Sequence, residues 1–271
     1  MASLELVSWA VGIAVAYMSC VWILSLILRN AGIVDSFWGP GFAVLAASLP
    51  VIAGGPTWRS LLVLGLVALW AGRLAAHVTV RNWGRAEDWR YAKWRAEAGS
   101  SFWWRSLFKV FLLQGLLLTV VAAPILALAL ADGRAGLSIF DVVGAGLWLI
   151  GFGFEAVGDA QLARFKRNPA NGGRVMNRGL WRYTRHPNYF GEAVLWWGIF
   201  LVAVSVPWGW ASIIGPITIT FLLLRVSGVR MLERGLRTRR PGYDEYVKRT
   251  SAFFPLPPKR SEGRRSRSED G

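Results

Sequence analysis

The 271-residue sequence contains little cysteine and little histidine, with one of the first and two of the second. Cys20 lies inside a long apolar run, so the chain can form neither a disulfide framework nor a cysteine-based metal site. His77 and His186 are widely separated along the chain, which argues against the clustered histidines of zinc and di-iron centres. We therefore expect no metal site.

Acidic residues are also scarce: 16 Asp and Glu stand against 31 Lys and Arg, giving a formal net charge of +15. The basic residues are concentrated in the connections between apolar runs, where membrane topology and attraction to anionic lipid headgroups account for them. The sequence has no P-loop, and no soluble-type dinucleotide fingerprint follows a strand. We expect a bilayer with anionic headgroups as a partner, no nucleic acid, and no obligate protein partner.

Apolar residues are abundant, since 54% of the chain is hydrophobic. A helix that crosses the hydrocarbon core needs about 20 predominantly apolar residues. The first run lacks a basic n-region and is too long for a signal peptide, so we expect it to be retained. The pattern predicts an all-α, polytopic helical membrane protein with about seven transmembrane helices, at residues 4–28, 37–53, 60–78, 107–130, 139–157, 189–206 and 208–224.

Lys and Arg are unevenly distributed among the connections. Those after the third and fifth runs and the C-terminal segment hold nearly all of them, whereas the alternate connections hold few, Arg59 among them. Under the positive-inside rule this predicts an N-terminus outside and a cytoplasmic C-terminus, in a multi-pass protein of the bacterial inner membrane. We expect one membrane domain over 1–258 and a disordered polar tail at 259–271.

Three polar segments stand beside the apolar runs. Residues 177–192 lead directly into the sixth run, the loop 81–91 interleaves Arg and Asn with aromatic residues, and residues 159–167 continue a helix. Asp159 and Lys166 share one face of that helix. Polar groups at the mouth of a span are costly to bury and mark functional sites, and Arg binds phosphate bidentately. Each segment alone is also compatible with a positive-inside loop, but their convergence predicts one pocket for an anionic cofactor.

Several motifs in and around these segments are specific in combination. They are Asp35-x-x-Trp38-Gly39, Asn82-x-Gly84-Arg85, Gly179-Leu180-Trp181-x-Tyr183, Pro187-Asn188-Tyr189-Phe190-Gly191-Glu192 and Arg240-Pro241-Gly242-Tyr243-x-x-Tyr246. With Arg174 upstream, this set resembles the steroid 5-alpha-reductase C-terminal superfamily and is most similar to its bacterial branch, labelled DUF1295. The resemblance covers nearly the whole chain except the tail.

The resemblance implies a seven-helix membrane reductase that binds NADPH from the cytoplasmic side. The implied reaction reduces a carbon–carbon double bond conjugated to a ketone in a lipophilic, steroid-like or isoprenoid substrate. The residues that fall where the family contacts the dinucleotide are Asn82, Arg85, Asp159, Lys166, Arg174, Asn188 and Glu192, with Tyr183, Arg185 and His186 as neighbours. The composition of the 81–91 loop adds Asp88, Arg90 and Tyr91 to this predicted cofactor site.

The proton donor is less well defined by the motifs. Hydride addition to the β-carbon leaves a developing enolate oxygen, which needs a proton donor or a strong hydrogen bond. The eukaryotic steroid reductases place a glutamate and a tyrosine over the substrate carbonyl, and neither has a clear counterpart here. Asp35 and Tyr189 are the predicted catalytic residues, with Tyr91 as an alternative donor; Asp35 could equally cap its helix. Trp38 and Phe42 would line an apolar slot for a flat substrate.

Two other interpretations stay open. Residues 182–189, with Glu233 and the Gly242-Tyr243-x-x-Tyr246 motif, also resemble the isoprenylcysteine and phospholipid methyltransferases, which bind S-adenosylmethionine. Those enzymes typically show paired glutamates where this chain has Leu232-Glu233, and they lack the Asn82-x-Gly84-Arg85 loop. A non-enzymatic lipid-binding protein is the third interpretation.

Overall fold

The chain forms helices almost throughout the residues that the computed structural model describes, which are 3–131, 136–226, 229, 233, 235, 236 and 240–259. No β-strand occurs among them, and a single isolated bridge joins Thr184 to Ser251. The all-α prediction is therefore confirmed. The α-helices are α1 (Ser3–Ile27), α2 (Val34–Ile52), α3 (Trp58–Asn82), α4 (Trp89–Ala98), α5 (Phe102–Ser106), α6 (Leu113–Val121), α7 (Ala123–Ala129), α8 (Ile139–Arg167), α9 (Pro187–Val204), α10 (Ile214–Phe221) and α12 (Tyr243–Arg249).

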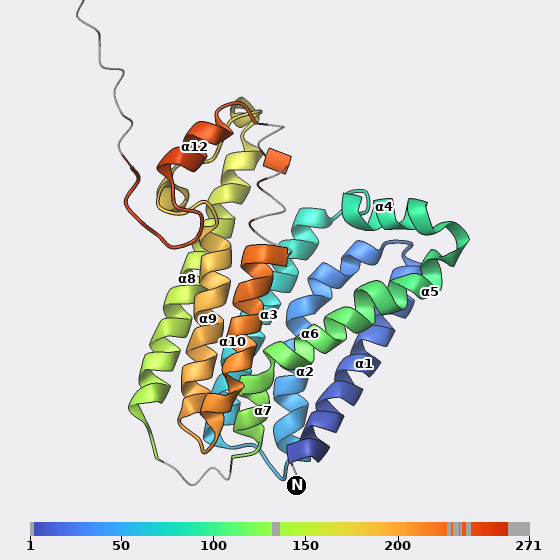
Figure 1. Cartoon of the computed structure of the whole chain (residues 1–271), viewed down its shortest axis with the longest axis vertical. Coiled ribbons are helices and arrows are strands. Elements are labelled where there is room, and N and C mark those ends of the chain that lie inside the picture. Colours follow the sequence, from blue (N-terminus) through green and yellow to red (C-terminus); the bar gives the residue numbers. More distant parts are fainter. Residues whose placement is uncertain are drawn as a thin grey trace, which may run out of the picture. The chain divides into compact units, whose positions relative to one another are not determined.

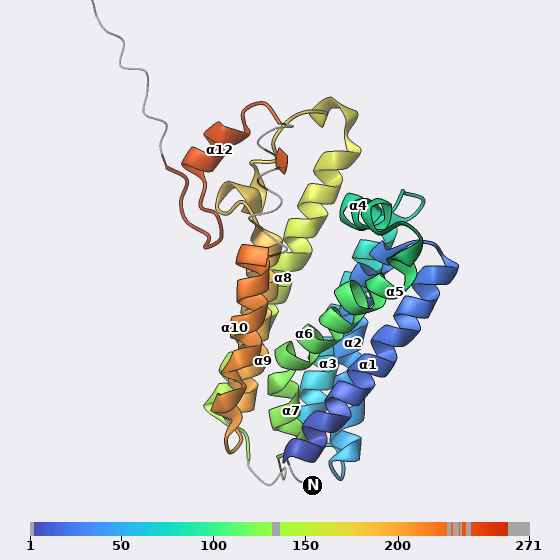
Figure 2. The same cartoon turned by 45° about the vertical axis from the view of Figure 1, so that its right-hand side comes forward.

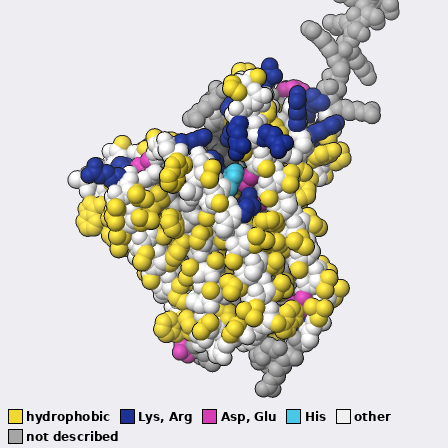
Figure 3. Space-filling view, turned by 180° about the vertical axis from the view of Figure 1, so that it is seen from behind, with side chains coloured by type: hydrophobic (Ala, Val, Ile, Leu, Met, Phe, Trp, Pro, Cys, Tyr) yellow, Lys and Arg dark blue, Asp and Glu magenta, His cyan; other side chains and the backbone are white. Residues whose placement is uncertain are grey.

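Six helical stretches of the described chain are long and apolar enough to cross a membrane: Ser3–Ile27, Ala31–Ile52, Trp58–Asn82, Trp89–Val121, Ile139–Arg167 and Gly209–Val226. Figure 3 shows hydrophobic side chains over much of one face, as lipid contact requires. The chain is thus a multi-pass helical membrane protein. The predicted sixth span forms as α9, whose first turns contain the polar residues Asn188 and Glu192. The number of seven spans, their orientation and the inner-membrane location stay predictions.

Two of the sequence predictions are wrong in detail. The loop expected over 81–91 already contains the start of α4, whose first turn is capped by Asp88. The span expected over 107–130 is not one α-helix: it begins as a π-helical segment (Leu107–Leu112) and breaks at Ala122 between α6 and α7. Pro124 stands in the first turn of α7, and its missing N–H cannot continue the hydrogen bonds of α6.

The chain divides into two compact units, with boundaries inside α8, α9 and α10. The first consists of Met1–Trp148 and Trp196–Thr218, and the second of Leu149–Leu195 and Ile219–Gly271. The expectation of one membrane domain over 1–258 stays a prediction. The expected disordered tail lies, except for Lys259, outside the described residues.

In the first unit, α1, α2, α3, α6 and α7 lie side by side (Figure 1, Figure 2). Aromatic rings fill its core: Phe42 is fully buried, and its ring centroid lies 4.6 Å from that of Trp196 and 5.8 Å from that of Trp70. Trp38 meets Phe42 edge to face at 5.2 Å. Phe42, expected to line a substrate slot, is therefore a core residue of this unit.

A buried ion pair joins the beginnings of α3 and α8 in the first unit. The guanidinium of Arg59 donates from Nε to Oδ1 of Asp141 and from Nη2 to Oδ2, both at 2.9 Å. Both side chains are almost fully buried, at 2% and 1% exposure. Arg59 thus serves as a structural cation, and its bidentate geometry offsets part of the cost of burying two charges.

Glycines let α8 and α9 approach closely as antiparallel helices. In the first unit, a Cβ on Gly144 would lie 2.7 Å from the carbonyl oxygen of Gly198. In the second unit, a Cβ on Gly151 would lie 2.6 Å from the carbonyl oxygen of Gly191. Seven residues further along α8, Gly158 lies against the backbone nitrogen of Asn188. Small residues are what close packing of membrane helices requires.

In the second unit, α12 and the chain after it are fixed to the segment before α9. The hydroxyl of Tyr246 donates to the carbonyl oxygen of Trp181, and Thr184 Oγ1 donates to that of Phe253 at 2.8 Å. The backbone N–H of Arg185 donates to Ser251 O at 2.9 Å. These contacts hold a polar segment in a defined position beside α9.

Candidate functional site

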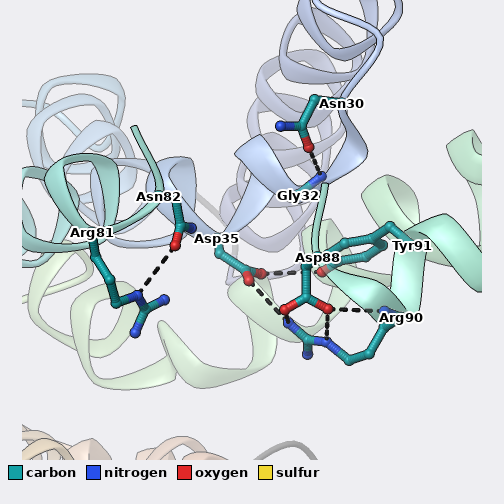
Figure 4. A network of polar contacts seen from close by, with 8 residues as sticks. All are labelled: Asn30, Gly32, Asp35, Arg81, Asn82, Asp88, Arg90 and Tyr91. Carbon is teal, nitrogen blue, oxygen red and sulfur yellow. Dashed lines mark hydrogen bonds and ion pairs between the residues drawn. The ribbon is translucent and has the colours of Figure 1, made fainter. Parts of the chain in front are cut away.

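A carboxylate, a phenol and a guanidinium meet in the first unit (Figure 4). Asp35, in the first turn of α2, accepts a hydrogen bond from the hydroxyl of Tyr91 at 3.1 Å and another from Nη2 of Arg90 at 3.1 Å. Tyr91 is 3% exposed. Ile33, which precedes α2, has no side-chain cap bond, so Asp35 does not cap the helix. The arrangement brings the predicted catalytic Asp35 and the alternative donor Tyr91 together.

Asp88 completes this cluster from the loop before α4. It caps α4 by accepting from the backbone N–H of Arg90 at 3.0 Å, and it accepts from Arg90 Nε at 2.8 Å. Burial raises the pKa of the Asp88 carboxyl, but the bonds from Arg90 outweigh it and hold the pKa below its ordinary value. Arg90 is therefore shared between two carboxylates of the protein, and Asp88 stays ionised.

Glu87 fastens the same loop to the chain before α2. Its carboxylate accepts from the backbone N–H of Ala31 at 2.6 Å and from Arg95 Nη2 at 2.8 Å. Burial raises the pKa of Glu87, yet the bonds from Arg95 and Ala31 bring the pKa below its ordinary value. The loop before α4 is thus held by Glu87 as well as by Asp88.

The Asn82-x-Gly84-Arg85 motif forms a tight turn at the end of α3. Arg85 N–H donates to Asn82 O at 3.0 Å, and Gly84 has a φ of +69°, which glycine adopts without strain. The side chains of Asn82 and Arg85 are exposed. The turn therefore presents a guanidinium to solvent, as the predicted phosphate contact requires.

In the second unit, Asn188 and Asp159 join α9 to α8. Asn188 Nδ2 donates to Asp159 Oδ1 at 3.1 Å. The other end of the amide, Oδ1, is buried and has no hydrogen-bond partner among the described residues. The contact with a carboxylate fixes which end of the amide is which, because only the nitrogen can donate. An unsatisfied buried acceptor is costly, so this position suits a ligand N–H.

Two glutamates lie near this pair on the same helices. Glu155 on α8 is 2% exposed and Glu192 on α9 is 8% exposed. Glu192 belongs to the predicted site, whereas the sequence prediction missed Glu155. A signal for it exists: an acidic residue inside an apolar stretch, one helical turn before Asp159, is rare in membrane spans and marks function.

Arg185, His186 and Glu233 form a charged cluster in the second unit. Arg185 Nε donates to Glu233 Oε1 at 2.7 Å, and its Nη1 donates to the carbonyl oxygen of Val247 at 3.2 Å. His186 Nε2 lies 3.2 Å from the same carboxylate oxygen. Burial lowers the pKa of His186, and Glu233 opposes that shift only in part. The ring of Tyr189 stacks on His186, with centroids 5.5 Å apart.

The pKa of Glu233 reflects how strongly Arg185 and His186 stabilise its ionised carboxylate. Burial raises it, but the hydrogen bonds from His186 and Arg185 lower it from 4.5 to about 2. Arg185, predicted as a cofactor cation, is therefore engaged by a carboxylate that lies 48 residues away in the sequence. Its predicted contact with a cofactor stays a prediction.

The remaining predicted site residues of the second unit lie at the surface. Lys166 and Arg174 are exposed, and the backbone carbonyl of Arg174 accepts from Arg240 Nη1 at 3.2 Å. Tyr183 is 43% exposed, and its backbone carbonyl accepts from Leu256 N–H at 3.0 Å. The predicted residues thus form separate groups within each unit, and their convergence into one pocket stays a prediction.

Comparisons with known proteins agree with the motifs. The family described as "Protein of unknown function (DUF1295)" matches residues 21–250. The "Uncharacterized protein C594.04c" of Schizosaccharomyces pombe is 24% identical over 91% of this chain and 79% of its own length. The bovine (Bos taurus) "3-oxo-5-alpha-steroid 4-dehydrogenase 1" is 32% identical over 30% of this chain and 31% of its own length. No solved structure gives a significant match. Because the family match spans most of the sequence, the chain belongs to the DUF1295 family.

Proposed function

We propose that the protein is a membrane-embedded, NADPH-dependent reductase of a carbon–carbon double bond conjugated to a ketone. The similarity to a steroid 4-dehydrogenase covers only a short part of the chain, so it supports the reaction class rather than a substrate. The observation that carries the proposal is the hydrogen bond between Tyr91 and Asp35. A buried phenol oriented by a carboxylate is the kind of group that can protonate an enolate.

The cluster around Tyr91 can handle the charge that such a reaction develops. Asp35 would position the phenol before the reaction. The single hydroxyl proton of Tyr91, which is donated to Asp35 in this structure, would then go to the substrate oxygen, which breaks the Tyr91–Asp35 hydrogen bond and leaves a phenolate. The guanidinium carbon of Arg90 lies 5.2 Å from the centroid of the Tyr91 ring, so a cation stands over the phenol ring. Because Asp88 and Asp35 both bind Arg90, the guanidinium has a fixed position and need not reorganise during the reaction.

The residues of the second unit fit a nicotinamide dinucleotide. The buried Oδ1 of Asn188 can accept from a ligand amide, and the Asn188–Asp159 bond holds it in place. The exposed cations Lys166 and Arg174 can bind phosphate. When bound, NADPH would supply the hydride. In this proposal Asn188, Asp159 and Glu192 orient the cofactor.

The substrate class follows from the membrane setting. Helices with exposed apolar surfaces, such as Phe108 at 60% and Leu61 at 53% exposure, lie in lipid, so a lipophilic enone would reach the protein from the bilayer. We propose a steroid-like or isoprenoid enone on this ground. A water-soluble enone of the same chemistry would be the poorer substrate.

A binding and turnover experiment tests the proposal. Detergent-purified full-length protein would be titrated with NADPH, NADH and S-adenosylmethionine, and then incubated with NADPH and a panel containing a 3-oxo-4-ene steroid and an isoprenoid enone. We expect NADPH to bind more tightly than NADH, because the 2′-phosphate adds charge-assisted hydrogen bonds, and at least one enone to be reduced. Binding of S-adenosylmethionine without NADPH would instead establish the methyltransferase interpretation. Absence of binding of all three ligands would favour a lipid-binding protein.

A further inference from the structure

The second unit contains a cavity that none of the predicted cofactor residues lines. It has a volume of about 420 Å³ and lies between the segment before α9 and the segment around α12. Its polar lining includes Asn177, Arg178, Arg182, Arg249 and Thr250. A volume of this size matches the 300–1,000 Å³ of small-molecule sites.

The two walls of this cavity are fastened together. Tyr246 of α12 lines the cavity, and its hydroxyl donates a hydrogen bond to the carbonyl oxygen of Trp181. Trp181 lies between Arg178 and Arg182 in the sequence. Beyond the cavity, Thr184 bridges to Ser251. A site with fixed walls keeps its shape without a ligand and loses little conformational entropy on binding.

Among the described residues, the arginines of the cavity have no charged partner. Arg178, Arg182 and Arg249 are exposed, and none of their side chains makes an ion pair or hydrogen bond with a described residue. Of the described residues that line the cavity, Glu245 is the one carboxylate. Arg185 of the same unit differs from these three arginines, because it forms an ion pair with Glu233. Three guanidinium forks around one hollow are suited to an anion with several oxygen atoms.

We propose that this cavity binds a phosphate monoester, separately from the cofactor. The carboxamide of Asn177 and the hydroxyl of Thr250 add hydrogen-bond donors for phosphate oxygens. The phosphate can belong to a lipid headgroup or to a soluble phosphate ester, because the binding chemistry is the same. The Arg-rich lining selects a doubly charged monoester over a singly charged diester.

The test uses the full-length protein in detergent with two probes. Native mass spectrometry would measure binding of phosphatidic acid against diacylglycerol, and calorimetry would measure binding of glycerol 3-phosphate against glycerol. The variant Arg182→Gln/Arg249→Gln removes two cations from the cavity. The matched control Arg167→Gln/Lys248→Gln removes two exposed cations that do not line it.

The cavity variant should weaken binding of at least one phosphate probe by about tenfold or more, from the loss of charge-assisted hydrogen bonds. The control should retain wild-type affinity, and NADPH binding should be the same in all three proteins. An effect on phosphatidic acid alone identifies a lipid headgroup, and an effect on glycerol 3-phosphate identifies a soluble ester.

Three results would overturn the proposal: no preference of the wild type for either phosphate probe, an equal loss in the control, or a parallel loss of NADPH affinity in the cavity variant. The last would make the cavity part of the cofactor site. Should the double variant melt early, Arg249→Lys gives the same test, because it keeps the charge and removes the planar fork.

Discussion

Asn188 reaches Asp159 across two helices because Gly158 has no side chain. A Cβ at position 158 would lie 3.2 Å from the backbone nitrogen of Asn188, and the amide of Asn188 donates to Asp159 Oδ1 at 3.1 Å. The close approach of α8 and α9 thus positions the polar pair that we assign to the cofactor. Packing of the helices and construction of the site depend on the same glycine contacts.

Two glycines of α8 should respond oppositely to alanine. Gly151→Ala would place a Cβ 2.5 Å from Leu195 N, whereas Gly153→Ala would meet nothing within 4 Å. We expect Gly151→Ala to lower stability by about 1–3 kcal/mol through overpacking. Gly153→Ala should be neutral or stabilising by up to about 1 kcal/mol through helix propensity. Thermal unfolding in detergent measures both, and equal melting temperatures would show that α8 and α9 are not in close contact at Gly151.

The buried Arg59–Asp141 pair should show strong coupling. Arg59→Met leaves the Asp141 carboxylate buried without its guanidinium, which should cost about 3–5 kcal/mol. The double variant Arg59→Met/Asp141→Leu should recover much of that loss, since no unpaired charge remains. A double-mutant cycle on unfolding free energies provides the measurement. Additive single effects would mean that the two side chains do not interact.

Acidification should destabilise the protein in part through Glu233. Its pKa is lowered from 4.5 to about 2, so the unfolded chain takes up a proton at higher pH than the folded one. The stability contributed by the ionised carboxylate is full above about pH 4.5 and is lost as the pH falls towards 2. His186 acts in the same direction below its ordinary pKa, because burial keeps the folded ring neutral.

The variant Glu233→Gln isolates this effect. On acidification from pH 4.5 to the lowest pH at which both proteins fold, the unfolding free energy of Glu233→Gln should fall less than that of the wild type. Glu245→Gln is the control, since Glu245 is exposed and makes no ion pair with a described residue. If Glu233→Gln and wild type show parallel pH profiles, the cluster with Arg185 and His186 does not exist in solution.

Arg85 should contribute planar phosphate recognition rather than charge alone. Arg85→Lys keeps the positive charge and therefore the orientation in the membrane, but it removes the bidentate fork. We expect the Kd for NADPH to rise about tenfold, or about 1.4 kcal/mol, with unchanged expression. Arg105→Lys, at another exposed arginine, serves as the control. An unaltered NADPH affinity in Arg85→Lys would remove the 82–85 turn from the cofactor site.

Local pattern was enough to predict the membrane helices but not their irregularities. Long apolar runs specify helices in lipid because every backbone polar group must be satisfied internally, and the helix through Lys166 was predicted to continue past its span, as α8 does. The start of α4 was missed, since the mixture of Arg, Trp and Tyr after Asp88 has the composition of an interfacial loop. The break at Ala122 depends on one proline, Pro124, in an otherwise apolar run.

The pairing of polar residues was harder to predict because it depends on contacts between distant parts of the chain. A motif identified Asp35 and the composition of the 81–91 loop identified Tyr91, but their hydrogen bond joins positions 56 residues apart. Arg185 was predicted as a neighbour of the cofactor, and only the folded chain brings Glu233 against it. Residue type indicates what a side chain can bind, whereas its partner is decided by packing.

The most direct test of the proposed reductase is the effect of Tyr91→Phe on the rate at which the enzyme oxidises NADPH. With the enone that the wild type reduces fastest, the decrease in reduced-nicotinamide absorbance gives the turnover rate, and calorimetry gives the NADPH Kd. Tyr17→Phe is the matched control, since Tyr17 donates a part-buried hydrogen bond to Phe37 O in the same unit. We predict that Tyr91→Phe lowers turnover by about 10²–10⁴-fold with the NADPH Kd unchanged, and that Tyr17→Phe stays active. Wild-type turnover in folded Tyr91→Phe would contradict the account.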